Sequence, residues 1–371
     1  MEYYLNNFYT SARQYGNQIL VRGISDGQRY LDRVKFQPTL YSLSNKESNF
    51  HSLSKEPLAV HKFSDINGAK EFVKKYEAVH NFKMFGNTKY HIQWISDLYR
   101  GEIEYNPDLI KTTTVDIETT VNLGFPDYCN PLEEITLISC KDRVTKATTT
   151  FGCWEYTPTK ENVTYVLCKN EKDLFMKFLS WWENDYCDII TGWHTDGFDI
   201  PYMIERMKRV VGEETTKRLS PFNMLKSREF EVNGQKNLSY EIYGIASLDY
   251  LELYKKFTYT TRESYKLDFI GEVELGMNKL ENPYETFKEF YEKDPQRFIE
   301  YNIVDTEIVD ALEEKLKLIG VAMSLAFMAK INFDDVFGAV AMWDSIVYNH
   351  LLNKNIIVLF AYSRWIKWNY S

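Results

Sequence analysis

Three short acidic motifs follow one another along the chain and supply the residue types for hydrolytic metal chemistry. They are, in order, Asp116-Ile117-Glu118, Phe198-Asp199 and the pair formed by Tyr301 and Asp305. Four carboxylates gathered from distant segments would repel one another strongly unless cations lay among them. Ligand sets made only of oxygen favour hard divalent ions such as Mg²⁺ or Mn²⁺, and two such ions can direct water onto a phosphodiester. The motifs therefore indicate a phosphodiesterase site that holds two divalent ions.

The sequence around the first motif predicts a strand that presents both of its acids on one face. Thr113, Val115 and Ile117 alternate with Thr114, Asp116 and Glu118, as in a strand with one buried face. Residues two apart on a strand point to the same side, so Asp116 and Glu118 would point together. Residues 135–140 and 146–153 are predicted to be antiparallel neighbours of this strand.

The other two motifs fall at helices. Asp199 lies where the buried stretch Asp188–Gly192 gives way to a helix. Asp294-Pro295 predicts the start of a long helix, with Asp as the N-cap and Pro in the first turn. Tyr301 and Asp305 are four residues apart on that helix and so share a face. Taken alone, the first motif fits a solvated strand face, the second a helix cap and the third an ordinary helix face. The three motifs together, in this order, favour one shared site.

The composition limits the classes of function. The chain has 371 residues, of which 44% are hydrophobic, enough for one large or two medium domains. Its net charge of −9 excludes a surface that binds polyanions throughout, so any contact with nucleic acid would be local. Five cysteines without a CxxC pair predict reduced thiols in a cytosolic protein. No apolar run approaches the roughly 18 residues of a membrane span, so no membrane contact is expected.

The chain before the first motif predicts a small α/β module without catalytic residues. Strands are expected within residues 17–44, and Asp65 could cap a helix over residues 68–79. The alternating stretch Tyr90–Ile95 predicts a further strand.

Residues 224–243 predict a protruding β-hairpin. Two strand-like runs flank Asn233-Gly234, a strong signal for a tight turn. Lys226 and Arg228 lie on the first run and could contact phosphate, although a solvated edge explains their charge equally well.

The acidic segments resemble the Exo I, Exo II and Exo III motifs of the proofreading exonuclease in family B DNA polymerases and, more narrowly, those of T-even-like bacteriophages. The matching stretches are Thr114–Glu118, Thr191–Trp193, Gly197–Asp199, Leu248–Phe257 and Tyr301–Asp305. The resemblance runs to about Asn353 and implies an α/β, RNase H-like exonuclease fold of the DEDD type, in its Tyr-containing subclass. It implies an amino-terminal module at 1–108, an exonuclease domain with a mixed sheet flanked by helices at 109–318, and a helical return segment at 319–371.

The resemblance also implies a role for each motif residue. Asp116, Glu118 and Asp305 would bind the two ions directly, with Asp116 bridging them. Asp199 would hold the second ion through water, and Tyr301 would orient the attacking water.

Substrate contacts are implied for residues near the second motif and in two loops. Phe125, His194 and Phe198 would contact the single strand, with Phe125 wedged against the terminal base unless it is an ordinary core residue. The family's second motif carries Asn four residues before its Phe, where this chain has His194, and neutral His offers its donor and acceptor in a different geometry. The hairpin, with Lys226, Arg228, Asn233 and Gly234, would help to hold primer and template strands apart.

The implied function is proofreading by 3′→5′ hydrolysis of DNA. The expected location is the cytoplasm, which is the host's cytoplasm if a phage encodes the chain. The polymerase motifs D-x-x-S-L-Y-P-S and D-T-D-S are absent from the chain, so synthesis would require a second chain that carries palm, fingers and thumb. Apolar residues from Val321 to Trp343 are expected to form an exposed patch for that partner, whereas residues 359–371 no longer resemble the family. The alternatives are a free-standing single-strand exonuclease and a polymerase remnant that only binds nucleic acid.

Overall fold

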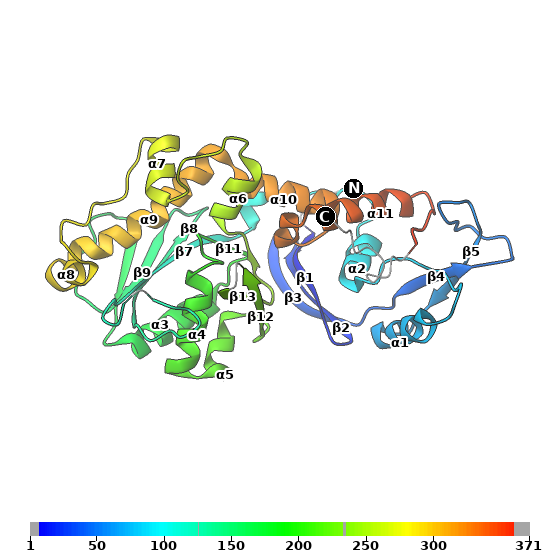
Figure 1. Cartoon of the computed structure of the whole chain (residues 1–371), viewed down its shortest axis with the longest axis horizontal. Coiled ribbons are helices and arrows are strands. Elements are labelled where there is room, and N and C mark those ends of the chain that lie inside the picture. Colours follow the sequence, from blue (N-terminus) through cyan, green and yellow to red (C-terminus); the bar gives the residue numbers. More distant parts are fainter. Residues whose placement is uncertain (1–6, 125, 233–234, 360–371) are drawn as a thin grey trace. The chain divides into compact units, whose positions relative to one another are not determined.

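The computed structural model describes residues 7–124, 126–232 and 235–359. The chain divides into two compact units (Figure 1). The part up to Tyr105 and the part from Ser324 onward form one of them, called here the terminal unit. Asn106–Met323 form the other, the central unit.

A mixed six-stranded sheet forms the centre of the central unit. Its strands are β7 (Thr112–Thr119), β8 (Ile135–Asp142), β9 (Thr148–Gly152), β10 (Val163–Leu167), β11 (Ile189–Thr191) and β14 (Ala246–Ser247), in the order β10-β9-β8-β7-β11-β14. β8 is antiparallel to both β7 and β9, whereas β10, β11 and β14 each run parallel to their inner neighbour. The predicted α/β class with a mixed sheet flanked by helices is confirmed.

Alternate residues of β7 belong to different layers of the central unit. Val115 and Ile117 lie in a hydrophobic core shared with α3 (Glu171–Asn184) and α4 (Asp199–Val211). The opposite face of the sheet carries Leu137, which packs with Ile303 of α9 (Pro295–Leu316). Glu118 pairs directly with Leu137 across the two strands, so the acids of β7 lie on the α9 face.

Four helices of the central unit begin at a side chain that caps them, among them α3 and α9. Asn170 accepts a hydrogen bond from the amide of Asp173 at the start of α3, and Asp294 accepts one from Arg297 at the start of α9, where Pro295 is the first residue. These contacts satisfy amides that have no partner inside the helix. The other helices are α5 (Glu213–Thr216), α6 (Tyr250–Phe257), α7 (Leu267–Leu275) and α8 (Phe287–Lys293). No helix in the described residues is long and apolar enough to cross a membrane.

A separate hairpin is attached to the central unit. β12 (Leu225–Val232) and β13 (Gln235–Ile242) pair antiparallel as a two-stranded sheet of their own. The hydroxyl of Tyr240 on β13 donates to Glu205 of α4, and the hydroxyl of Tyr128 donates to Asn237 Oδ1 at 2.8 Å. The second contact ties the hairpin to the loop that follows β7.

The terminal unit contains two small antiparallel sheets. One is formed by β1 (Phe8–Tyr15), β2 (Gln18–Ser25) and β3 (Gln28–Val34), and the other by β4 (Thr39–Leu43), β5 (Leu58–Lys62) and β6 (Met84–Phe85). Asp65 caps α1 (Ile66–Glu77) by accepting a hydrogen bond from the amide of Gly68, as the sequence predicts.

The prediction of a strand at Tyr90–Ile95 is wrong, because these residues begin α2 (Tyr90–Leu98). Its buried side chains include Ile92, Ile95 and Ser96, which have the three- and four-residue spacing of one helix face. In the sequence, Tyr90, Ile92 and Trp94 also alternate with His91 and Gln93, and six residues are too few to distinguish this alternation from the period of a helix.

The later part of the chain completes the terminal unit. It contains the end of α10 (Leu318–Ala329) and α11 (Ala339–Leu352). The Tyr9 hydroxyl donates to the carbonyl of Ile331 at 2.7 Å, and Asn332 exchanges hydrogen bonds of 2.7 and 3.0 Å with the backbone of Ala12. First and last segments thus share one core.

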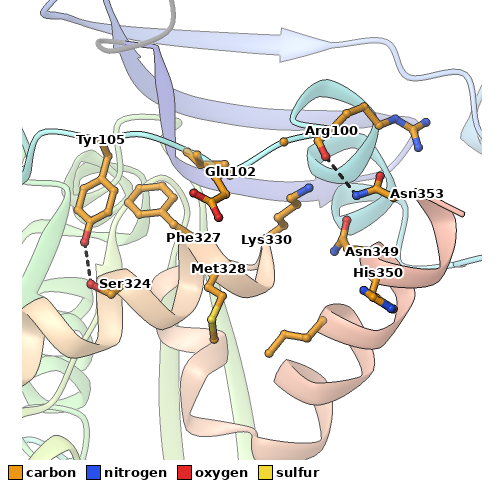
Figure 2. A pocket seen from close by; sticks show the side chains of 13 residues that line it. Arg100, Glu102, Tyr105, Ser324, Phe327, Met328, Lys330, Asn349, His350 and Asn353 are labelled. Atoms are coloured by element: carbon orange, nitrogen blue, oxygen red, sulfur yellow. Dashed lines mark hydrogen bonds between the residues drawn. The ribbon is translucent and has the colours of Figure 1, made fainter.

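A cavity of about 620 Å³ lies inside the terminal unit, among residues 100–105, the end of α10 and α11 (Figure 2). Tyr105 and Ser324 are joined by a 2.9 Å hydrogen bond at one side, and Asn353 donates to the carbonyl of Arg100 at the other (Figure 2). Lys330 is buried and donates to the carbonyl of Tyr99. These contacts hold the 99–105 segment against both helices.

Candidate active site

An acidic cluster forms where the polar face of β7 meets α9. Asp116, Glu118 and Asp305 each offer a carboxylate oxygen, and these three oxygens lie within 4.8 Å of one another. Asp305 is buried, whereas Asp116 and Glu118 remain partly exposed. The strand supplies two acids because residues two apart share a face, and the helix that packs on that face supplies the third.

Asp199, the fourth acid nominated by the sequence, lies beside this cluster at the start of α4. Its Oδ1 accepts a hydrogen bond of 3.2 Å from the amide of Ile117, between the two acids of β7. Its oxygens do not belong to the 4.8 Å group, but its charge raises the pKa of Asp116, second only to burial. Asp199 is therefore electrically part of the site.

A tight turn between β11 and α4 positions Asp199. A Cβ atom on Gly192 would lie 2.4 Å from the carbonyl oxygen of Val115, and one on Gly197 would lie 2.1 Å from the His194 ring. The clash at position 192 is with backbone, so this position requires glycine, whereas a side chain at position 197 would have to displace the exposed His194 ring. His194 has a φ of 68°, a left-handed conformation in which Asn and His are both over-represented. His at this position meets the backbone requirement that Asn would meet, and its exposed ring lies against Gly197.

Burial and mutual repulsion make these carboxyl groups weak acids. Burial, and then Asp305, raises the pKa of Glu118 to about 8. Burial also raises the pKa of Asp199 to about 7, against the opposing hydrogen bond from Ile117. The pKa of Asp116 is raised well above its usual range by burial and by the other three acids. A cluster that disfavours negative charge to this degree would be stabilised by a bound cation.

The loop after α7 contributes Lys279, which the sequence motifs did not reveal. Its Nζ forms an ion pair with Asp305 Oδ2 and lies 5.2 Å from the centre of the Tyr301 ring. Burial alone would lower the pKa of Lys279, but Asp305, Tyr301 and Asp116 hold it above its usual value. Lys279 therefore offsets part of the negative charge of the cluster.

Asn302 is a second residue that the motifs did not single out. It is fully buried on α9, and its Nδ2 donates to Asp116 Oδ2 at 2.6 Å. Its place three residues before Asp305 is a spacing that puts both side chains on one helix face, which is the signal that could have indicated it.

The chemistry of the cluster fits a divalent metal ion. Its ligand atoms are all carboxylate oxygens, the donors that Mg²⁺ and Mn²⁺ prefer. Asp305 Oδ2 pairs with Lys279, but Asp305 Oδ1 is buried and has no hydrogen-bond partner in the described part of the chain. A buried acceptor without a partner is costly, and a cation would satisfy it.

Tyr301 lies at the edge of the cluster, with its ring against Phe287 and Phe290 at centroid distances of 6.0 and 5.9 Å. Burial raises the pKa of Tyr301 to about 12. The phenol therefore remains protonated at neutral pH and can donate a hydrogen bond.

The residues expected to contact substrate do not form one cluster, unlike the acidic residues. Phe198 stacks on Tyr202 at a centroid distance of 5.3 Å and packs against the core of the central unit. On the hairpin, Lys226 lies 3.6 Å from Glu241, and Arg228 is exposed. Phe125, Asn233 and Gly234 lie outside the residues that the structure describes.

A mixed sheet with helices on both faces, and acids gathered on the polar side of a central strand, define a nuclease-type α/β domain. Residues 65–270 match the family model described as DNA polymerase family B, exonuclease domain. The chain belongs to this family, and the resemblance stated from its motifs is confirmed.

Named polymerases extend this match over nearly the whole chain. The DNA-directed DNA polymerases of Escherichia phage RB69 and Enterobacteria phage T4 are 29% and 30% identical to it, each over 95% of this chain. The DNA polymerase of Orgyia pseudotsugata multicapsid polyhedrosis virus is 26% identical over 53% of the chain. The chain spans 42% of the length of each phage relative. The family model ends before Tyr301 and Asp305, but an alignment over 95% of the chain includes both.

The metal-free protein should lose stability as pH rises from about 4 to about 8. A carboxyl group whose pKa is higher in the folded protein than in the unfolded chain binds protons preferentially in the folded state, so raising pH favours unfolding. The window follows from the usual carboxyl pKa near 4 and from the pKa of Glu118 at about 8. The measurement is the thermal unfolding midpoint in chelator as a function of pH, repeated with Mg²⁺. Mg²⁺ and Asp116→Asn should each flatten the fall, and a midpoint independent of pH in chelator would contradict the electrostatics described.

Proposed function

We propose that this chain is the proofreading 3′→5′ exonuclease portion of a DNA-directed DNA polymerase, of the DEDD type with a tyrosine. Its reaction is hydrolysis of the 3′-terminal phosphodiester of DNA, supported by two Mg²⁺ or Mn²⁺ ions. The observation that carries the proposal is the group of Asp116, Glu118 and Asp305 oxygens within 4.8 Å of one another, with Asp305 Oδ1 left unpaired. Neither fact has an explanation in the stability of the fold.

Each residue of the cluster has a part in this chemistry. Asp116, Glu118 and Asp305 would hold the ions directly, and Asp199 would act through water because its oxygens lie outside the closest group. Bound divalent ions supply Lewis-acid activation of water and neutralise charge on the leaving oxygen. Tyr301, with a pKa of about 12, donates a hydrogen bond that orients water and does not act as a base.

The substrate strand is proposed to pass the start of α4. Phe198 and His194 lie at that turn, and Phe125 comes between β7 and β8 in the sequence. An aromatic side chain can stack on any base, which suits an enzyme that must accept every 3′ end. The direct partner in this proposal is therefore single-stranded DNA at a primer terminus.

Asp116→Ala should reduce cleavage of single-stranded DNA by roughly 10³-fold or more, because charge in the transition state goes unneutralised. Tyr301→Phe should cost roughly 10²-fold or less, since it disturbs only the placement of water. The measurement is single-turnover cleavage of a 3′-labelled oligonucleotide with Mg²⁺ and with chelator. Glu214→Gln, at a side chain 88% exposed, is the matched control and should leave the rate unchanged. Robust cleavage by Asp116→Ala would sink the assignment, and equal losses in both variants would refute the orienting role of Tyr301.

The hairpin is proposed to help keep primer and template strands apart. Its second strand is fixed to the central unit by Tyr240 and Asn237, whereas Lys226 is 64% exposed and Arg228 is also exposed. A firmly held base with an exposed outer edge suits an element that separates strands.

Deleting the hairpin tip at Asn233 and Gly234 should spare cleavage of single strands, because the carboxylates are untouched. It should reduce removal of a paired primer end when a chain with palm, fingers and thumb is present. The measurement compares the two substrates side by side, with Lys226→Ala plus Arg228→Ala as a milder variant that keeps the turn. An equal loss on both substrates would make the hairpin structural.

A second chain that carries palm, fingers and thumb is proposed as the protein partner. The polymerase carboxylate motifs are absent from this sequence, and the chain spans 42% of its phage relatives. Of the apolar residues expected to be exposed, Met323, Phe327 and Val336 are buried, but Val340 and Trp343 are 76% and 61% exposed. Val340 and Trp343 are three residues apart on α11 and so share a face, and exposed apolar patches mark interaction surfaces.

Co-expression with a chain that carries those domains should give a complex that co-elutes and incorporates nucleotides, whereas this chain alone should incorporate none. Trp343→Glu should weaken the complex by placing a charge in an apolar interface, while Glu214→Gln should not. Sizing with light scattering at micromolar concentration is the measurement. Separate elution would favour a free-standing single-strand exonuclease or a remnant over half of a split enzyme.

A further inference from the structure

Asn302 connects the two elements that carry the acidic cluster. It lies on α9, one residue after Tyr301 and three before Asp305. Its side-chain Nδ2 donates to Oδ2 of Asp116, on β7, at 2.6 Å. The NH₂ group of the amide therefore faces Asp116, and an Asp116 carboxylate that a bound cation keeps ionised can only accept. A hydrogen bond to an ionised acceptor is short and directional.

Among the described residues, Asn302 is the one that forms a hydrogen bond with the side chain of Asp116. Ser139 is the direct neighbour of Asp116 across the sheet, but its hydroxyl is bonded to Thr150 at 2.8 Å. The ammonium group of Lys279 pairs with Asp305. The orientation of the Asp116 carboxylate is thus fixed from α9.

The amide at position 302 is a cost to the fold. Asn302 is 0% exposed, and its Oδ1 has no partner among the described residues. A leucine of similar size would avoid an unsatisfied buried acceptor. Packing therefore does not account for asparagine at this position, whereas a requirement to hold Asp116 does.

We propose that Asn302 is a positioning residue that orients the Asp116 carboxylate toward Glu118 and Asp305 and thereby sets the affinity of the site for divalent cations. This inference rests on the proposed function. Partners that orient metal ligands are typically worth 10- to 100-fold in metal affinity or activity. Asn302 contacts neither substrate nor ion in this scheme and acts only through Asp116.

The test is Mn²⁺ binding by calorimetry on the whole chain without DNA. Asn302→Leu should weaken Mn²⁺ binding by roughly 10-fold or more, while the metal-free unfolding midpoint stays the same or rises because an unpaired buried acceptor is removed. Replacing a residue with a purely structural role would not weaken Mn²⁺ binding while leaving the unfolding midpoint unchanged or higher. Asn302→Ala, which only removes atoms, covers the case in which leucine does not fit, and should also weaken binding.

Asn349→Leu is the matched control. Asn349 is buried in the terminal unit and donates to the carbonyls of Ser345 and Ala329, so its loss should lower the midpoint and leave Mn²⁺ affinity unchanged. In a cleavage assay, the position-302 variants should need more Mg²⁺ for half-maximal rate and recover much of the rate at saturation. Wild-type affinity in both position-302 variants would overturn the inference. If the wild type and Asp116→Ala bound Mn²⁺ equally poorly, the proposed function itself would fail.

Discussion

Electrostatic repulsion among carboxylates is the constraint on which the central unit depends. Asp116, Glu118, Asp199 and Asp305 occupy one partly enclosed site, and each has a raised pKa. A protein keeps such a site only if a rigid frame prevents the acids from turning apart. β7 and α9 provide that frame, with Lys279 compensating part of the charge at Asp305.

The sheet also separates this polar site from the apolar core. On β7, Val115 and Ile117 contribute to the core beneath α3 and α4, while Asp116 and Glu118, which alternate with them, face α9. A shift of one residue in register would exchange the two sets and bury the acids among aliphatic side chains. The antiparallel pairing of Asp116 with Ser139 and of Glu118 with Leu137 therefore protects both the core and the chemistry.

The parts of this arrangement that depend on local geometry could be predicted from the sequence. Two acids spaced by one residue on a strand, or a tyrosine and an acid spaced by four on a helix, point together whatever surrounds them. Lys279 could not be predicted in this way, because its loop has no pattern and only tertiary folding brings it to Asp305. The prediction of a strand at Tyr90–Ile95 is wrong for a different reason: six residues are too few to distinguish the period of a helix from that of a strand. His194 departs from the motif, but its φ of 68° shows that it adopts the left-handed backbone conformation that this position of the turn requires.

The division of the chain also bears on the order in which its parts can fold during synthesis. Tyr105 and Ser324, where the chain leaves and rejoins the terminal unit, are held together by a hydrogen bond of 2.9 Å. The strand β1 bonds to Ile331 and Asn332, so β1 has to wait for residues that are made about 320 positions later. The central unit needs no such delay, because Asn106–Met323 are continuous. If the central unit folds first, it brings the flanking residues together and removes most of a loop-closure entropy that would otherwise be about 5 kcal/mol for a loop of this length. The central unit would then act as the template that lets the two segments of the terminal unit find each other.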